Sequence, residues 1–318
     1  MKSRIAFLLY DNRSGSTFLS ARMESLRDCY VTNESDFTSR IFYWKNTTNE
    51  NLIDFLFNDM RFVDMQITKE ELNQFIENNN PDNKSLIEYI LLTHFKKRYS
   101  FFEDKVENII VIKHPPIGDF NLVRELWPNV KFIYLIRDGR DIHLSKYNSI
   151  DLYENRFSDN IIGSAINWNK KVALFSSISA KSDTIKYETL IKNEYIYDFL
   201  SNFLSIPNVI NEEKEYPLPK NQIGFHTNVT KKTIKNNNRK YDENSYENFV
   251  YNLFSSRYLL AFDYPTININ KIFKIKYILY LFRDILLFIL FTTYNSFKYL
   301  IRDRYLFISK VKKFLKIK

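Results

Sequence analysis

Arg13-Ser14-Gly15-Ser16-Thr17 form a short polar stretch that could bind an anion. An apolar run, Ile5 to Tyr10, precedes it and has the length of a buried strand, and Ser16 to Met23 has the character of the first turns of a helix. A strand, a turn of small residues and a helix direct free backbone N–H groups at an anion. Arg13 adds a planar charged group suited to phosphate oxygens. The stretch therefore predicts a phosphate-type site, with an ordinary strand-to-helix turn as the alternative.

Two further groups of polar residues follow predicted strands. Val130 to Ile136 is an apolar run that ends at Arg137, and Ser145 lies about two turns farther along the helix expected after it. Asn108 to Ile112 is another buried-strand candidate, and it ends at Lys113-His114, before two prolines. Arg137 can bind a second anion, and a structural salt bridge, for example to Asp141, is the alternative.

The elements that must position these residues are parallel strands separated by helices. This order predicts an α/β fold, a doubly wound parallel sheet flanked by helices, in a domain of residues 1–266. A further short strand is expected at Thr184 to Tyr187, followed by one helix from Glu188 to Leu204. Ligands bind at the carboxyl edge of such sheets, which is where the polar residues gather.

The composition excludes some classes of protein. A single cysteine, Cys29, rules out an intramolecular disulfide, and no CxxC metal pattern occurs. The net charge is +9, but Lys271 to Lys318 contain twelve Lys and Arg against two Asp. The excess charge therefore belongs to the tail, and a basic nucleic-acid-binding face on the main domain is not expected.

Three segments in order resemble the sulfotransferase family, which uses 3′-phosphoadenosine 5′-phosphosulfate. The stretch from Arg13 to Thr17 is similar to the family's 5′-phosphosulfate loop, and YLIRDGRDIHLSKYNS, with Arg137 and Ser145, is similar to its 3′-phosphate motif. Ile185-Lys186-Tyr187-Glu188-Thr189-Leu190 resembles its strand-to-helix "YEdL" segment. The resemblance spans roughly residues 4–265. It implies that the first stretch binds the phosphosulfate and that Arg137 and Ser145 bind the 3′-phosphate.

The same resemblance offers a late loop for the 3′-phosphate. Lys231, Arg239 and Lys240 occupy the place of this loop, without its usual glycine. A solvated run of charges is the alternative interpretation of these residues.

Two residues compete for the role of general base. Glu34 lies in Asn33-Glu34-Ser35-Asp36-Phe37, which resembles the family's "PPEshF" segment, although Thr32-Asn33 replace the prolines. His114 is the rival, but Lys113-His114-Pro115 resembles the family's "KxP" form. That form implies Lys113 near the sulfonyl or bridging oxygen and His114 on the structural or acceptor side. A solvated loop carboxylate is the alternative for Glu34.

The chain from residue 267 to 318 is expected to be a separate basic helical tail. Ile272 to Leu300 is largely apolar but is interrupted by Arg283-Asp284, and Lys298 to Lys318 is basic and amphipathic. A helical hairpin on an anionic membrane surface fits this pattern. A subdomain packed on the enzyme and a dimer contact are the alternatives.

The leading hypothesis is a sulfotransferase that acts on a hydroxyl of a glycan or lipid-linked sugar, in the cytoplasm or at the inner face of the membrane. No metal ion is expected, since a sulfonyl group carries less charge than a phosphoryl group and no obvious carboxylate cluster is present. A P-loop kinase or NTPase is the first alternative, although the Walker lysine is missing. The second is a membrane-recruited protein that binds the donor without catalysis.

Overall fold

The computed structural model describes residues 1–43, 49–113, 120–147, 160–180, 183–216 and 245–302. The chain forms two compact units. Unit 1 comprises Met1–Arg137 and Ala173–Asn237, and unit 2 comprises Asp138–Val172 and Asn238–Lys318. The division at residue 266 stays a prediction.

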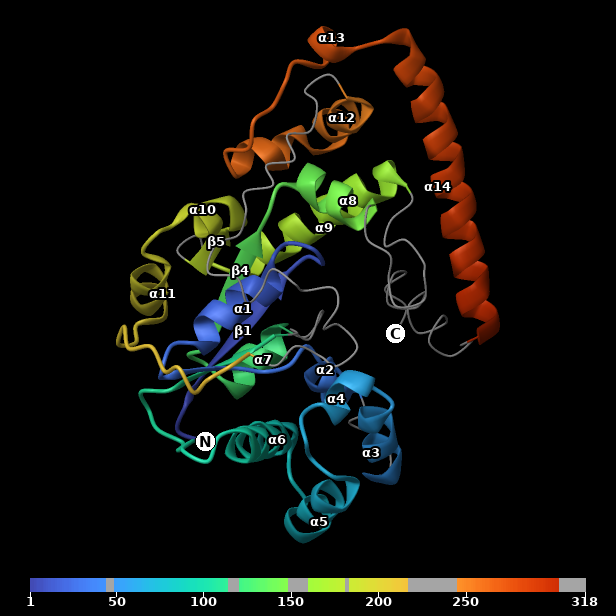
Figure 1. The fold of residues 1–318 in the computed structure, drawn as a ribbon. Coiled ribbons are helices and arrows are strands. Elements are labelled where there is room, and N and C mark those ends of the chain that lie inside the picture. Colours follow the sequence, from blue (N-terminus) through green and yellow to red (C-terminus); the bar gives the residue numbers. More distant parts are fainter. Residues whose placement is uncertain (44–48, 114–119, 148–159, 181–182, 217–244, 303–318) are drawn as a thin grey trace. The chain divides into compact units, whose positions relative to one another are not determined.

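Unit 1 is built on a parallel sheet (Figure 1). The described strands are β1 (Arg4–Tyr10), β2 (Cys29–Val31), β3 (Ile109–Ile112), β4 (Lys131–Ile136) and β5 (Thr184–Lys186), in the order β2-β3-β1-β4-β5. All four pairings are parallel, and the strands are apolar because helices cover both faces. The sheet grows outward from β1 in both directions, which confirms the predicted doubly wound α/β fold. The end of β1 is therefore the point where such sheets bind ligands.

The helices of unit 1 are α1 (Ser16–Glu24), α2 (Phe37–Tyr43), α3 (Asn49–Phe57), α4 (Met60–Val63), α5 (Lys69–Asn79), α6 (Asn83–Arg98), α7 (Phe120–Leu126), α10 (Tyr187–Lys192) and α11 (Ile196–Leu204). Those of unit 2 are α8 (Gly139–Tyr147), α12 (Tyr246–Ala261), α13 (Ile269–Ile272) and α14 (Ile275–Arg302). Helix α9 (Ile161–Ile178) begins in unit 2 and ends in unit 1.

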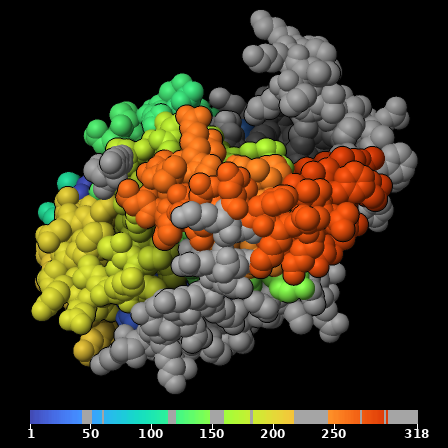
Figure 2. Space-filling view, turned by 90° about the horizontal axis from the view of Figure 1, so that it is seen from above, coloured from blue at the N-terminus to red at the C-terminus, as the bar shows by residue number. Residues whose placement is uncertain are grey.

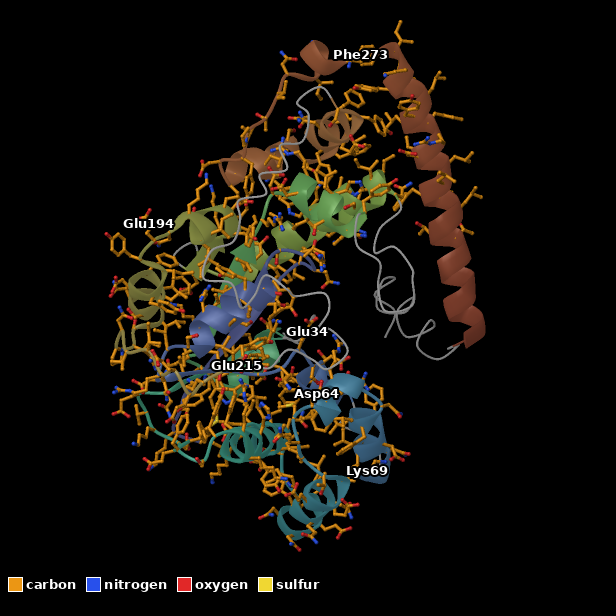
Figure 3. All side chains as sticks on the ribbon, viewed as in Figure 1. Glu34, Asp64, Lys69, Glu194, Glu215 and Phe273 are labelled. Atoms are coloured by element: carbon orange, nitrogen blue, oxygen red, sulfur yellow. The ribbon has the colours of Figure 1, made fainter. Side chains whose placement is uncertain are left out.

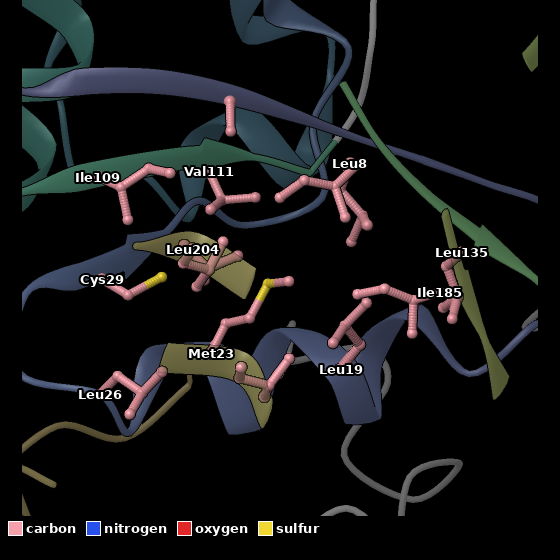
Figure 4. Close-up of a cluster of buried hydrophobic side chains, with 14 of the residues drawn as sticks. Leu8, Leu19, Met23, Leu26, Cys29, Ile109, Val111, Leu135, Ile185 and Leu204 are labelled. Carbon is pink, nitrogen blue, oxygen red and sulfur yellow. The ribbon is translucent and has the colours of Figure 1, made fainter. Parts of the chain in front are cut away.

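Successive residues of the strands in unit 1 serve two different cores. Leu8 of β1 packs with Leu19 and Met23 of α1 and Leu204 of α11 on one face, as Figure 4 shows. The next residue toward the N-terminus, Phe7, faces the other side and meets aromatic rings there (Trp127 at 6.3 Å and Phe132 at 6.0 Å between ring centroids). This alternation of side chains anchors α1 and the turn that precedes it against the sheet.

The single helix predicted over residues 188–204 is wrong. The structure has two helices, α10 and α11, because the backbone at Asn193 is extended, with φ −80° and ψ 107°. The Asn193 side chain accepts a hydrogen bond from the backbone N–H of Tyr195 at 2.9 Å. An asparagine that bonds its own backbone two residues on offers the chain an alternative to the helix.

Unit 2 contains a small core of its own. Trp168 of α9 is buried against Tyr251 of α12, with the ring centroids 6.3 Å apart, and Gly139 of α8 leaves room for both rings. Arg140 is buried and bonds Asp138 at 2.6 Å and Asn248 at 2.9 Å, so its charge is compensated within the unit.

The apolar part of the tail forms one continuous helix. Helix α14 runs unbroken through Arg283-Asp284 to Arg302, because apolar residues follow that charged pair without any Gly or Pro. The predicted hairpin stays a prediction, because residues 303–318, which would form most of its second arm, lie outside the described part. None of the helices that the structure describes is both long enough and apolar enough to cross a bilayer.

Candidate functional site

The turn between β1 and α1 has a backbone suited to an anion. Arg13 and Gly15 have positive φ angles of 69° and 93°, and the N–H of Ser14 bonds the carbonyl of Asp11 at 3.1 Å. The first N–H groups of α1, which begins at Ser16, have no carbonyl partners within the helix. The Ser14 hydroxyl is buried and has no hydrogen-bond partner among the described residues. A turn with αL residues, free N–H groups and an unsatisfied hydroxyl forms a concavity that favours anions.

Arg137 joins this turn from the end of β4. Its Nη1 donates to the carbonyl of Arg13 at 2.9 Å, and its guanidinium stacks on the ring of Tyr187, 4.5 Å from the centroid. The Tyr187 ring also closes over Gly15, where a Cβ atom would lie only 2.3 Å from ring carbon Cε2. The structure thus brings together the three segments that carry the resemblance. Tyr187 connects them, a role that the motif alone did not indicate.

The two arginines concentrate positive charge at one place. Burial, and then the neighbouring charge of Arg137, lower the pKa of Arg13. Two like charges that lie close together each favour a nearby negative charge. The turn is therefore a place where an anionic group would be stabilised.

Lys113 follows β3 and points at the start of α1. Its side chain is 1% exposed, and its Nζ donates to the Oγ1 of Thr17 at 3.1 Å. The backbone N–H of Lys113 bonds the Oγ1 of Thr32 at 3.0 Å, which ties the end of β3 to the loop after β2. The ammonium group therefore lies beside the anion-binding turn, within a buried frame.

Glu34 lies on the loop after β2, next to Lys113. Its Oε2 is 3.8 Å from the Lys113 Nζ, and its Oε1 is 3.4 Å from the Arg61 Nη1. The side chain is 18% exposed, so the carboxylate is accessible but largely enclosed. Glu34 and Asp64 lie on the same side of unit 1 (Figure 3). The parallel pairing of β2 with β3 places Glu34 and Lys113 together.

The loop that carries Glu34 is fixed without the prolines that are usual in the family. The Asn33 amide donates to the carbonyl of Asp64 at 3.1 Å, and the Ser35 hydroxyl donates to Asp59 at 2.8 Å. Thr32 and Asn33 are both buried. Side-chain hydrogen bonds therefore hold the carboxylate in position where backbone rigidity would otherwise do so.

Sequence reasoning missed two residues beside Glu34. Tyr10 ends β1, and its buried hydroxyl makes no hydrogen bond of ordinary geometry with the described residues. Burial, and then the Glu34 carboxylate, raise the pKa of Tyr10. Arg61 lies on α4, in a region without a recognisable motif. Only the position of Tyr10, directly before the turn, could have drawn attention to it.

The other predicted site residues stay predictions from the sequence. Ser145 lies on α8 and belongs to unit 2. His114, Lys231, Arg239 and Lys240 lie outside the described residues. Within the described ranges, no group of three or more His, Cys, Asp or Glu side chains is arranged to hold a metal ion.

Glu34, Lys113, Thr17 and the N-terminus of α1 form a continuous series. A carboxylate at one end can take a proton, and the ammonium and the N–H groups that follow can compensate developing negative charge. Arg13 and Arg137 extend the cationic surface around the turn. This order of groups suits the transfer of an anionic group between two oxygen atoms.

The fold and the turn after the central strand are typical of α/β proteins that bind phosphorylated ligands. The family model described as "Sulfotransferase family" matches residues 8–195, which is more than half of the chain. The chain belongs to the sulfotransferase family, and sulfonyl transfer is the activity that this family supports.

Two solved structures resemble the chain at low identity. The sulfotransferase domain from the curacin biosynthetic pathway has 16% identity and a TM-score of 0.45. The match covers 84% of this chain and 99% of that domain. A sulfotransferase from Alicyclobacillus acidocaldarius has 9% identity and a TM-score of 0.38. The match covers 69% of this chain and 88% of that structure. No curated protein sequence matches the chain.

Proposed function

We propose that this protein transfers the sulfonyl group of 3′-phosphoadenosine 5′-phosphosulfate to a hydroxyl of a glycan or lipid-linked sugar. The observation that carries the proposal is the bond from Arg137 to the carbonyl of Arg13, which joins two cationic groups at one turn. The donor carries a 5′-phosphosulfate and a ribose 3′-phosphate, so it can compensate both charges at once. The buried hydroxyl of Ser14, which has no hydrogen-bond partner among the described residues, supports such a ligand.

The donor's two anionic ends have different candidate residues. Arg13, Ser14, Gly15, Ser16 and Thr17 would hold the 5′-phosphosulfate through the turn and the first N–H groups of α1. Arg137 would hold the 3′-phosphate.

Ser145 is proposed for the same 3′-phosphate on the strength of its sequence motif. Lys231, Arg239 and Lys240 stay candidates for the late loop, also from sequence alone.

Transfer then needs a proton acceptor and compensation of the leaving charge. Glu34 takes the proton of the acceptor hydroxyl, and the oxygen of that hydroxyl forms a bond to sulfur. At the same time the bond between sulfur and the bridging oxygen of the donor breaks. The electron pair of that bond stays on the leaving phosphate, where Lys113 compensates the charge. The distance of 3.8 Å between the Glu34 Oε2 and the Lys113 Nζ supports the assignment of both groups to one reaction centre. His114 stays a candidate on the acceptor side.

Donor binding can be tested without knowledge of the acceptor. Adenosine 3′,5′-bisphosphate should raise the melting temperature of the wild type. At a concentration of 100 times its Kd, the ligand should raise the free energy of unfolding by about 2.7 kcal/mol. Arg137→Ala should weaken binding by roughly 10- to 100-fold, because a charged hydrogen bond contributes about 1.5–3 kcal/mol. The matched control is Arg124→Ala, since Arg124 is an exposed arginine of α7.

The outcomes separate the competing functions. An unchanged melting temperature in the wild type, or an equal gain in Arg137→Ala, contradicts the proposed donor site. Stabilisation by ATP with Mg²⁺ but not by the bisphosphate favours a P-loop kinase or NTPase instead.

A ³⁵S-labelled donor, offered with a panel of glycans and glycolipids, tests the transfer itself. Glu34→Gln should lower transfer by about 10²–10⁴-fold and leave the thermal shift intact. Binding by the wild type without transfer to any acceptor favours a donor-binding protein that does not catalyse.

A further inference from the structure

Helix α14 is attached to unit 2 along one narrow stripe. Tyr277 is 3% exposed and packs between Tyr246 and Phe249, with ring centroids 5.5 and 5.4 Å away. The carbonyl of Asp284 accepts a hydrogen bond from the Asn160 amide at 2.8 Å. Residues 277, 281, 284 and 288 share this stripe by helical spacing. Contact with the rest of unit 2 therefore uses only a minor part of the helix surface.

The opposite side of α14 is a broad apolar face. It contains six side chains that are each 50–79% exposed, namely Ile275, Leu279, Phe282, Leu286, Ile289 and Leu290. Their spacing puts them on one side of the helix, away from the packed stripe. In Figure 2, α12 to α14 form a continuous exposed surface in orange and red. An exposed apolar patch of this extent marks an interaction site on a folded protein.

The charges beside this apolar face are positive. Lys276 and Arg283 are exposed and lie seven residues apart on one flank of it, and Lys274 is exposed just before the helix. The acidic residue of α14, Asp284, is buried in the packed stripe and forms an ion pair with Arg283 at 2.8 Å, while the Arg283 side chain stays 61% exposed. The sequence after the helix adds further Lys and Arg, up to Lys318. Acyl chains suit the apolar face, and anionic headgroups suit its cationic flank.

A second copy of the chain suits this face less well than a lipid surface. A symmetric dimer along α14 would place the same cations of both copies at the contact, with no exposed acidic residue of the described helix to compensate them. A spanning orientation is also unfavourable, since it would put the charged pair Arg283-Asp284 of α14 into the hydrocarbon core. A helix that lies in the membrane interface buries its apolar face among the acyl chains and keeps its cations at the headgroups.

We propose that α14 docks this protein on the surface of an anionic phospholipid bilayer, with the face around Leu279 and Leu286 inserted among the acyl chains. Lys276 and Arg283 then contact the headgroups. The inference stands on unit 2 alone and does not depend on the proposed sulfonyl donor. If both hold, the enzyme works beside lipid-linked acceptors.

The full-length protein can be tested by flotation with vesicles of phosphatidylcholine, with and without phosphatidylglycerol. We expect the wild type to float with the anionic vesicles and to be released by salt. The double variant Leu279→Gln, Leu286→Gln should lower the bound fraction at least tenfold. The double variant Val63→Gln, Val106→Gln is the control, because these residues of unit 1 are similarly exposed (52% and 63%).

Several outcomes would overturn the proposal. Equal flotation of the wild type and the α14 variant removes the apolar face as the anchor, and equal binding to neutral and anionic vesicles removes the role of the cations. A wild-type dimer in light scattering that becomes monomeric in the α14 variant, without vesicle binding, assigns the face to a second copy. The thermal shift with adenosine 3′,5′-bisphosphate should be the same in both double variants, so a failure here is distinct from a failure of the donor site.

Discussion

Replacement of Gly15 by alanine tests the geometry of the anion-binding turn directly. Gly15 precedes α1 with φ 93° and ψ 17°, a backbone conformation that residues with a Cβ atom adopt only with strain. An added Cβ would also lie 2.3 Å from Cε2 and 2.4 Å from Cδ2 of the Tyr187 ring. The ring cannot move freely, because the guanidinium of Arg137 stacks on it. We therefore expect Gly15→Ala to disturb both the turn and Arg137.

The magnitude follows from two separate effects. The left-handed backbone costs about 1–2 kcal/mol for a residue with a Cβ atom. Overpacking against the Tyr187 ring costs about 1–3 kcal/mol. The free energy of unfolding should therefore fall by about 2–5 kcal/mol, a large part of the 5–15 kcal/mol that is usual for folded domains. The affinity for adenosine 3′,5′-bisphosphate should fall as well, since the turn and Arg137 shift together.

Urea unfolding followed by tryptophan fluorescence measures the stability, and titration with the bisphosphate measures the affinity. Gly163→Ala is the control, because Gly163 lies inside α9 and its added Cβ would meet the Phe288 ring at 3.2 Å and the Asn160 Oδ1 at 3.8 Å. That control should change the stability by less than about 1 kcal/mol, since helix propensity offsets the close contact. In a Tyr187→Ala background, Gly15→Ala should lower the free energy of unfolding by only about 1–2 kcal/mol, because only the backbone strain remains. Equal stability of Gly15→Ala and Gly163→Ala would refute the described turn.

Two further predictions concern buried ionisable groups. Lys113→Met should leave the free energy of unfolding within about 1–2 kcal/mol of the wild type, since Glu34 is partly exposed and keeps its ion pair with Arg61. The same variant should nevertheless lower kcat for transfer from the labelled donor by about 10²–10³-fold. Lys97→Met is the control, because the Lys97 side chain is more exposed. An unchanged kcat in Lys113→Met would contradict the role of Lys113. Burial lowers the pKa of His94 to about 3 and of His143 to about 4, below the unfolded value of about 6.5. The unfolded state therefore binds more protons as the pH falls through 6.5, and each histidine should remove about 1 kcal/mol of stability between pH 7 and 5.5. Urea unfolding at the two pH values measures this loss, and His94→Leu or His143→Phe should reduce it; a pH-independent stability would show that these histidines are solvated.

Much of unit 1 could be predicted from local patterns in the chain. The apolar run before Arg13 forms β1, and the polar stretch that follows forms the turn and the start of α1. The run that ends at Arg137 forms β4. These elements were predictable because burial of a parallel strand and the start of a helix each depend on neighbouring residues.

Other features depended on residues far apart in the chain. Tyr10 and Arg61 lie beside Glu34 only because the ends of β1 and β2 and the helix α4 meet at one edge of the sheet. No periodicity or motif encodes that meeting. The exposed face of α14 was likewise undecided in the sequence, since its apolar residues could equally have formed a buried core.

The sequence by itself determined the parallel α/β class, the strand, turn and helix around Arg13, and the family to which the chain belongs. Only the tertiary structure decided that Arg137 stacks on Tyr187 over Gly15, and that Lys113 stands between Thr17 and Glu34. The physical reason is that backbone preferences act over a few residues, whereas these contacts depend on the register between strands that are distant in the chain.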